Sequence, residues 1–171
     1  MDKEKLKKAI LWGLAVFGIL LIATYFLGIG IYIDSQKPGS LPWYCYIRVP
    51  YKTPFRTEIL PGDYIAFRAD RRMLPYFAPG VIFGKRVVGV SGDHLEVRGR
   101  EFYLNGRLLT RARETDSQGN PAPLFTYNGT IPQDCYFVLG HHYKSFDSRY
   151  WGFVCRGAVV GRLVPLGFRK Y

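Results

Sequence analysis

The stretch that decides the fold is Val81-Ile82-Phe83-Gly84-Lys85-Arg86-Val87-Val88-Gly89-Val90, an apolar run interrupted by one basic pair. Its β-branched and aromatic residues predict a strand, in which successive side chains point to opposite faces. Lys85 therefore shares a face with Phe83 and Val87. An amine on such a face loses water, which lowers its pKa and lets it act as a neutral base. A lysine that reaches solvent from a sheet edge is the alternative interpretation.

The chain on either side of this stretch is also typical of β structure. Short runs rich in Val, Ile, Tyr and Phe recur at Tyr64–Arg68, His94–Arg98, Glu101–Leu104, Cys135–Leu139 and Ala158–Leu163. Turn signals separate them at Pro61-Gly62-Asp63, Ser91-Gly92-Asp93, Asn105-Gly106 and Asn128-Gly129. The Asn-Gly pair at 105–106 predicts a two-residue hairpin. We expect a mostly β fold, either a barrel or two packed antiparallel sheets.

An apolar stretch precedes the β region. Ala9–Ile33 contains no Asp, Glu, Lys, Arg or His, and as a helix it would extend roughly 37 Å, enough to cross a bilayer core of about 30 Å. No small-x-small cleavage pattern follows it, so we expect a retained signal anchor; a buried helix of a soluble protein is the alternative. The basic residues before the span are Lys3, Lys5, Lys7 and Lys8. Since such residues mark the cytoplasmic side, we expect a cytoplasmic segment 1–8, a transmembrane anchor 9–33 and an extracytoplasmic β domain 34–171.

The net charge of the whole chain is +11. The part after Ile33 has 20 basic and 11 acidic residues, a net charge of +9, which bears on the partners of this domain. A basic domain tethered to a bilayer is attracted to anionic headgroups. Nucleic-acid binding is the competing interpretation of the same charge. The arginines are scattered and form no basic helical stripe, so we expect a lipid surface and no nucleic acid.

The three cysteines are Cys45, Cys135 and Cys155, and their spacing fits no zinc motif. An extracytoplasmic domain has room for one disulfide, which leaves one free thiol. A bridge between Cys135 and Cys155 would close a loop around residues 145–152. Pairing with Cys45 is the alternative.

Two further segments carry groups that can act with Lys85. Gly39-Ser40-Leu41-Pro42 places a serine on an extended, turn-like backbone, as a nucleophile requires. Ser145-Phe146-Asp147-Ser148-Arg149-Tyr150-Trp151-Gly152 is a dense polar group beside aromatic residues. A hydroxyl there can orient a lysine amine, and Asp147 and Arg149 can pair to hold the loop. Ordinary hydrogen-bonded turns are the alternative for both segments.

In their order along the chain, these segments resemble the boxes of type I signal peptidases. The family's lysine box is similar to Lys85-Arg86-Val87-Val88-Gly89 followed by Gly92-Asp93. The box between nucleophile and lysine is similar to Pro61-Gly62-Asp63 leading into Ile65-Ala66-Phe67. The C-terminal box is similar to residues 145–152, extended by Val160-Gly161-Arg162. Ser40 stands where the family's nucleophile stands, and the resemblance covers nearly all of the chain.

The resemblance implies an all-β catalytic domain that lies on the membrane and needs no metal or other cofactor. Lys85 would deprotonate Ser40, which would attack the peptide carbonyl after small residues at substrate positions −1 and −3. Ser145 would hydrogen-bond the lysine amine, while Asp147 and Arg149 would be structural supports. Three residues that adjoin this Ser–Lys dyad are expected to contact the substrate: Leu41, Phe83 and Gly84.

Three departures from the housekeeping enzymes matter. Proline is the second residue after the nucleophile, at Pro42, which together with the short chain and single span resembles the conjugative-transfer, TraF-type branch. That branch processes pilin precursors, and some members join the cut end to the other terminus. The position two before the nucleophile, where the family has a hydroxyl as second oxyanion donor, is Pro38. Gly140-His141 stands in place of a Gly-Asp pair.

The sequence therefore predicts a serine endopeptidase of the bacterial inner membrane, single-pass and with its catalytic domain outside the cytoplasm. Its expected partner is a membrane-inserted precursor, either a pilin or another signal-peptide-bearing protein. A general housekeeping signal peptidase and a non-enzymatic membrane-tethered assembly factor are the alternatives. A Ser–His–Asp triad from Ser40, His141 or His142, and Asp147 is a weaker alternative, since it leaves the lysine box unexplained. A metal site at His141 and His142 is also weaker, because it needs further ligands that the sequence does not indicate.

Overall fold

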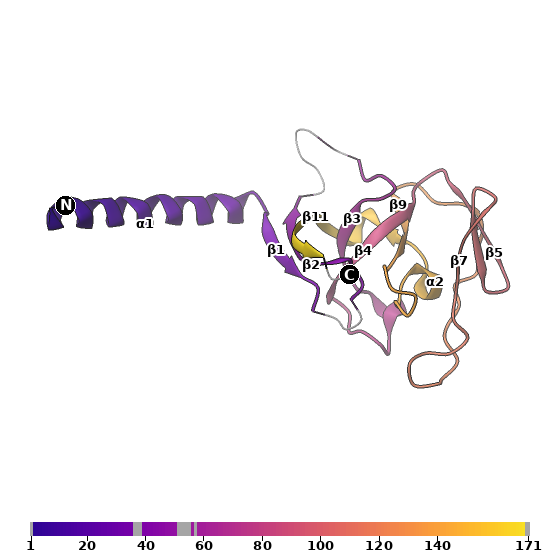
Figure 1. The fold of residues 1–171 in the computed structure, drawn as a ribbon. Coiled ribbons are helices and arrows are strands. Elements are labelled where there is room, and N and C mark those ends of the chain that lie inside the picture. Colours follow the sequence, from indigo (N-terminus) through magenta and orange to yellow (C-terminus); the bar gives the residue numbers. More distant parts are fainter. Residues whose placement is uncertain (1, 36–38, 51–55, 57, 170–171) are drawn as a thin grey trace.

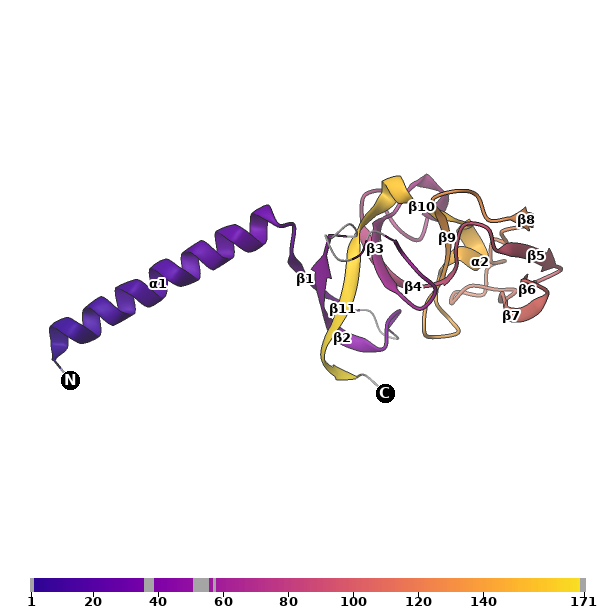
Figure 2. The ribbon, with the colours of Figure 1, turned by 90° about the horizontal axis from the view of Figure 1, so that it is seen from above.

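The computed structural model describes residues 2–35, 39–50, 56 and 58–169. Its first element is helix α1, Lys3–Phe26, which projects away from a β domain (Figure 1, Figure 2). The Asp2 carboxylate accepts the Glu4 N–H at the start of this helix. None of its residues is buried against the β domain. Within the described part of the chain, α1 is the one helix long and apolar enough to cross a membrane.

The apolar stretch over residues 9–33 is helical only in part. Helix α1 ends at Phe26, and Gly28 follows with a left-handed φ of +66°. The N–H groups of Gly28 and the next residue return to carbonyls of the last helical turn, at 3.0 and 2.9 Å. This Schellman arrangement stops the helix because glycine takes a positive φ without steric cost. Gly30–Ile33 then form a strand, so the prediction of one continuous helix to residue 33 is wrong.

Two antiparallel sheets make up the β domain, which confirms the mostly β fold class. The larger has the strand order β1-β2-β11-β3-β4-β9-β10, and the smaller has the order β7-β6-β5-β8. The larger sheet comprises β1 Gly30–Ile33, β2 Trp43–Val49, β3 Tyr64–Arg68, β4 Ile82–Gly89, β9 Cys135–Leu139, β10 Val154–Cys155 and β11 Val159–Arg169. The smaller comprises β5 His94–Arg98, β6 Glu101–Leu104, β7 Arg107–Arg111 and β8 Asn128–Thr130. The short helices are η1 Arg71–Met73, α2 Ser148–Trp151 and η2 Arg156–Ala158.

Strand β4 lies inside the larger sheet, with β3 on one side and β9 on the other. Lys85 stands opposite Ile65 of β3. Phe83, Lys85 and Val87 are buried, while Arg86 is exposed. The predicted face is therefore confirmed, and the sheet-edge alternative is wrong because β4 has a neighbour on each side.

The hairpin predicted at Asn105-Gly106 is also confirmed. Both residues have positive φ, 51° and 77°, and they connect β6 to β7 with Leu104 opposite Arg107. Two consecutive left-handed residues match the right-handed twist of the paired strands, which is why Asn-Gly is favoured at this position.

A disulfide joins Cys135 of β9 to Cys155 of β10, two residues that stand opposite each other in the sheet. The bridge closes a loop around helix α2. It is the Cys135–Cys155 pairing predicted from the sequence, and not the alternative pairing with Cys45. Cys45, on β2, has a free thiol.

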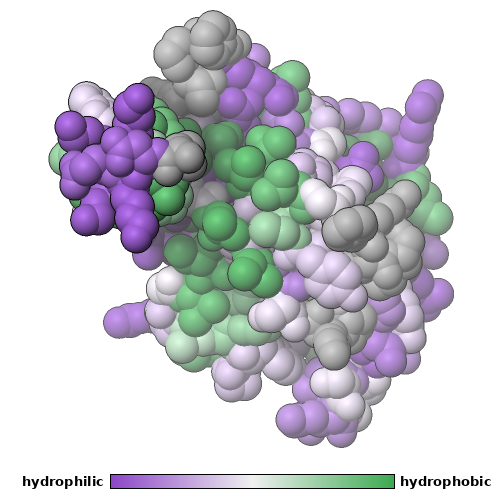
Figure 3. Space-filling model, turned by 60° about the vertical axis from the view of Figure 1, so that its left-hand side comes forward, coloured by the Kyte–Doolittle hydropathy of each residue, from purple (hydrophilic) through white to green (hydrophobic). Residues whose placement is uncertain are grey.

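Apolar side chains form two rows across β1, β2 and β11. One row is Ile31, Ile47 and Val164, and the other is Ile33, Cys45 and Leu166. The isoleucines of β1 are 74% and 66% exposed, and the β11 members are 48% and 47% exposed. Figure 3 shows hydrophobic residues gathered on the side of the molecule from which α1 projects. We call this surface the apolar rows.

Candidate active site

Three segments far apart in sequence bring two serines and a lysine together. Ser40 lies just before β2, Lys85 at the centre of β4, and Ser145 in the loop between β9 and α2. Lys85 Nζ donates to Ser145 Oγ at 3.0 Å and is hydrogen-bonded to Ser40 Oγ. All three residues are buried, with 6%, 3% and 8% of their surface exposed. The structure thus brings together the predicted nucleophile, the predicted base and the hydroxyl predicted to support it.

The environment of Lys85 favours its neutral form. Burial lowers the pKa of its amine from 10.5 to about 8, against the opposing effects of the Asp147 and Asp34 carboxylates. The Arg149 guanidinium lowers the pKa further. With a pKa of about 8, roughly one amine in ten is neutral at pH 7, compared with about one in three thousand for a free lysine.

Asp147 and Arg149 form a buried, two-pronged ion pair at the start of α2. Arg149 Nε and Nη2 donate to the two carboxylate oxygens of Asp147 at 2.8 and 2.9 Å. Arg149 Nη2 also donates to the Ser145 carbonyl at 3.0 Å, and Asp147 accepts the Gly140 N–H at 3.0 Å. The pair therefore fixes the loop that carries Ser145 at both ends, as a structural support would.

Gly140 makes room for Ser145. A Cβ at this position would lie 1.9 Å from Ser145 Oγ and 2.4 Å from Ser145 Cβ. The following residue, His141, donates its backbone N–H to the Ser40 carbonyl at 2.8 Å. The Gly140-His141 pair, which the sequence left without a role, therefore holds the nucleophile and its supporting serine in contact.

His141 and His142 are not among the residues that line the cavity over Ser40. Both residues line a separate cavity with Arg111 and Tyr143. His142 Nδ1 accepts the backbone N–H of Lys144 at 3.1 Å. The Asp147 carboxylate accepts hydrogen bonds from the Arg149 guanidinium and from the Gly140 N–H. Within the described residues, no three His, Cys, Asp or Glu side chains lie close enough to hold a metal ion.

A cavity of about 420 Å³ opens over the dyad. Ser40, Lys85 and Ser145 line it together with an aromatic wall of Tyr76, Phe77, Phe146 and Tyr150. The ring centroids of Tyr76 and Phe146 are 4.6 Å apart, and those of Phe146 and Tyr150 are 5.4 Å apart. The remaining lining residues come mainly from the loop after β7: Arg113, Thr115, Asp116, Ser117, Ala122, Pro123 and Lys144. A cavity of this size lies within the range of ligand-binding pockets.

The three residues expected to contact substrate lie beside this cavity and do not line it. Leu41 is fully buried, and its side chain fills the space that a Cβ on Gly84 would need, at 2.6 Å. Phe83 is buried with its ring centroid 6.0 Å from Lys85 Nζ. Their contact with substrate stays a prediction. Pro38, the position of the family's second oxyanion donor, lies outside the described residues.

The fold and the site together define a class: a β domain behind an apolar helix, with a serine and a buried lysine at the base of a cavity. The model of the family "Signal peptidase, peptidase S26" matches residues 6–166, so the chain belongs to this family. The family predicted from the sequence motifs is thereby confirmed.

Individual relatives differ in how much of the chain they match. A probable signal peptidase I-2 of Synechocystis is 37% identical over 82 residues, which are 47% of this chain and 35% of the relative. The chain thus spans about a third of that relative's length. A probable conjugal transfer protein TraF of Sinorhizobium fredii is 27% identical over 94% of this chain and 90% of its own length, which supports the TraF-type branch. A crystal structure of a signal peptidase I from Enterococcus faecalis is 29% identical over 61% of this chain and 95% of its own, with a TM-score of 0.39.

Proposed function

We propose that this protein is a membrane-anchored serine endopeptidase that cleaves leader segments from exported precursor proteins. Ser40 is the nucleophile and Lys85 the general base. The observation that carries the proposal is the buried Lys85 amine, hydrogen-bonded to Ser40 Oγ and Ser145 Oγ at the base of the cavity. Membership of the signal peptidase family supports the same reaction class.

The reaction begins when neutral Lys85 accepts the Ser40 hydroxyl proton while Ser40 Oγ bonds to the scissile carbonyl carbon. The resulting lysine ammonium then gives this proton to the leaving amine as the peptide bond breaks, which leaves an ester on Ser40. Water, deprotonated by the same amine, hydrolyses the ester and restores the hydroxyl. Ser145 keeps the amine directed at Ser40, because its Oγ accepts a hydrogen bond from Nζ in either protonation state.

The membrane arrangement follows from α1 and its flanks. We place residues 1–8 in the cytoplasm, the anchor from residue 9 to the end of α1 at Phe26 in the bacterial inner membrane, and the β domain from β1 onward outside. The Cys135–Cys155 disulfide supports an oxidising compartment for the β domain, since such bonds persist outside the cytoplasm. Strand β1 follows α1 directly, so the β domain sits at the membrane surface.

The apolar rows give this surface a lipid contact. They begin on β1, the first strand after the anchor, and expose isoleucine and leucine side chains that water does not favour. Residues 34–171 carry 20 basic and 11 acidic side chains, and this net charge of +9 adds attraction to anionic headgroups. Both features bring the dyad close to the bilayer, where the cleavage site of a membrane-inserted precursor lies.

The relative named a probable conjugal transfer protein TraF supports a role in conjugative transfer, and we propose a pilin precursor as the substrate because the resemblance to the TraF-type branch implies one. The test is co-expression of the full chain with a candidate pilin precursor, followed by mass spectrometry of the product. We expect a product shortened at a site preceded by small residues. A product mass one water below that of the linear fragment would assign ring closure, and the linear mass would assign hydrolysis.

Single substitutions test the dyad in the same assay. Ser40→Ala and Lys85→Ala should each abolish processing and leave a folded, membrane-bound protein. Ser91→Ala, which changes an exposed serine in the turn after β4, is the matched control and should process normally. Near-normal turnover by either dyad variant would contradict the assignment.

A further inference from the structure

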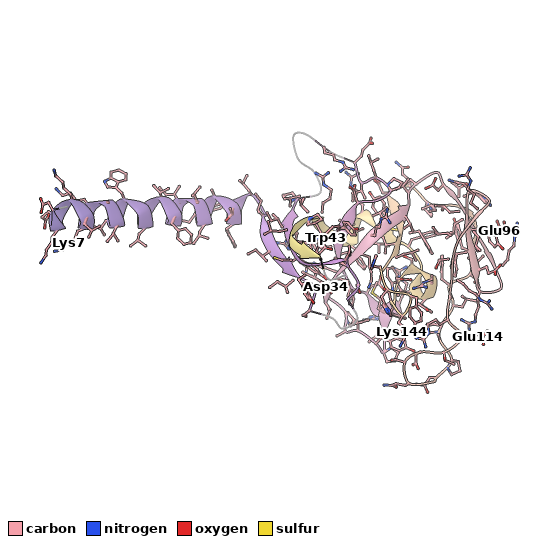
Figure 4. All side chains as sticks on the ribbon, in the orientation of Figure 1. Lys7, Asp34, Trp43, Glu96, Glu114 and Lys144 are labelled. Carbon is pink, nitrogen blue, oxygen red and sulfur yellow. A yellow bond between two sulfur atoms is a disulfide. The ribbon has the colours of Figure 1, made fainter. Side chains whose placement is uncertain are left out.

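The peptide group between Ser40 and Leu41 is held on both sides. Its carbonyl accepts the His141 N–H at 2.8 Å, and its N–H donates to Asp34 Oδ2 at 2.9 Å. Asp34 is 2% exposed and comes from the segment that follows β1 (Figure 4). A carboxylate this deeply buried is costly unless it is paired and hydrogen-bonded, so its place beside the nucleophile calls for a role.

We propose that Asp34 is a positioning residue for the nucleophile, and that its carboxylate and the His141 N–H clamp the Ser40–Leu41 peptide group so that Ser40 Oγ faces Lys85 Nζ. This inference rests on the proposed function of the dyad and adds a residue to it.

The clamp is needed because Ser40 lies outside the regular helices and strands. Rotation of the peptide group that follows it would swing the hydroxyl away from the amine, and a misplacement of about 1 Å at a reacting centre costs on the order of 100-fold in rate. His141 is in turn fixed through its neighbour, since the Gly140 N–H donates to Asp147. A continuous series of hydrogen bonds thus runs from Asp34 across the nucleophile to Asp147.

Asp34 also acts on Lys85 through its charge. The charged groups that influence Lys85 are Asp34, Asp147 and Arg149, and the Asp34 and Asp147 carboxylates raise the lysine pKa against the larger effect of burial. Asp34 itself interacts with the phenols of Tyr32 on β1 and Tyr46 on β2. Removing the charge of Asp34 while keeping its oxygen should therefore lower the pKa of Lys85 and leave the clamp in place.

Two substitutions separate these effects in the full chain in detergent micelles. Asp34→Ala removes the acceptor, so we expect kcat to fall on the order of 100-fold with KM unchanged. Asp34→Asn keeps an acceptor oxygen and should restore most of kcat, while the rising limb of its pH–rate profile moves to lower pH. Asp93→Asn is the matched control, because Asp93 accepts the Val90 N–H at the same 2.9 Å in a turn that does not line the cavity.

Two readouts do not depend on activity. Hydrogen exchange of the Leu41 amide should accelerate at least tenfold in Asp34→Ala and much less in Asp34→Asn. An NMR titration of Lys85 labelled at the ε-carbon should show a lower pKa in Asp34→Asn than in wild type. Unchanged Leu41 exchange in Asp34→Ala, or an unchanged Lys85 pKa in Asp34→Asn, would overturn this inference. If the wild-type protein cleaves no precursor while the Leu41 exchange and the Lys85 pKa behave as expected, the proposed function is overturned and the positioning role of Asp34 is retained.

Discussion

Lys85→Met removes the buried amine and keeps an unbranched side chain of similar size. In the wild-type protein, burial lowers the Lys85 pKa from 10.5 to about 8. At 1.36 kcal/mol for each unit, holding the charged amine in the folded state at pH 7 costs about 3 kcal/mol. The variant avoids this cost but loses the hydrogen bonds of the charged amine to Ser40 and Ser145, which are worth about 1.5 kcal/mol each or more. These two effects nearly cancel, so we expect Lys85→Met to be inactive and close to wild type in its free energy of unfolding at pH 7.

The pH dependence gives the sharper test. Between pH 8 and pH 10.5 the unfolded state binds more protons at Lys85 than the folded state, so the wild-type free energy of unfolding rises with pH in that window. The free energy of unfolding of the variant relative to wild type should therefore fall by about 2 to 3 kcal/mol from pH 7 to pH 10. Other titrating groups are common to both proteins and cancel in the difference.

Equilibrium urea unfolding in detergent micelles, with the disulfide intact, measures this difference through the fluorescence of Trp43 and Trp151. Lys144→Met, which removes an exposed lysine, controls for the loss of one positive charge. A stability difference between Lys85→Met and wild type that stays constant from pH 7 to pH 10 would refute the reasoning, because it would mean that the folded state does not depress the lysine pKa.

Two further substitutions test the surroundings of the site. Gly140→Ala places a Cβ against Ser145, so cleavage should fall on the order of 100-fold, while Gly157→Ala, which extends into open space, should stay near wild type. Equal turnover by the two alanine variants would contradict the close packing. Cys155→Ser opens the bridge to Cys135 and should lower the free energy of unfolding by about 3 kcal/mol in urea without reductant. The stability difference between Cys155→Ser and wild type should vanish when dithiothreitol reduces the wild-type protein. A difference that persists under reduction would mean that the substitution acts through packing and not through the disulfide.

Local signals explain which parts of the fold the sequence predicts. Successive side chains of a strand over residues 81–90 point to opposite faces, which is sufficient to predict that Lys85 is buried. The Asn-Gly pair at 105–106 is sufficient to predict a hairpin. Strand β1 is not predicted, because apolar residues look the same in a membrane helix and in an exposed strand, and only Gly28 and Gly30 mark the change. Strand β2 is not among the predicted strands, although its aromatic and β-branched residues favour one.

Ser145, Asp147 and Arg149 are predicted from one segment, but the contacts of Asp34, Gly140 and the cavity wall depend on tertiary packing that no local pattern records. The proposed role of Asp34 depends on its contact with the Leu41 N–H, and that of Gly140 depends on Ser145 occupying the space beside it. Tyr76 and Tyr150 resemble core residues in sequence, and their place in the cavity wall depends on how distant segments pack. The Gly140-His141 pair stands out in the sequence only as a departure from a Gly-Asp pair, and its role is seen only in the structure.

The central claim is that neutral Lys85 takes the proton from Ser40, and the pH dependence of kcat/KM tests it most directly. A rising limb with an apparent pKa near 8 is predicted. It should persist in the double variant His141→Ala/His142→Ala, and Lys85→Arg should be inactive because guanidinium does not deprotonate. A limb near 6.5 that disappears in the histidine double variant, or an active Lys85→Arg, would show that the base is another group.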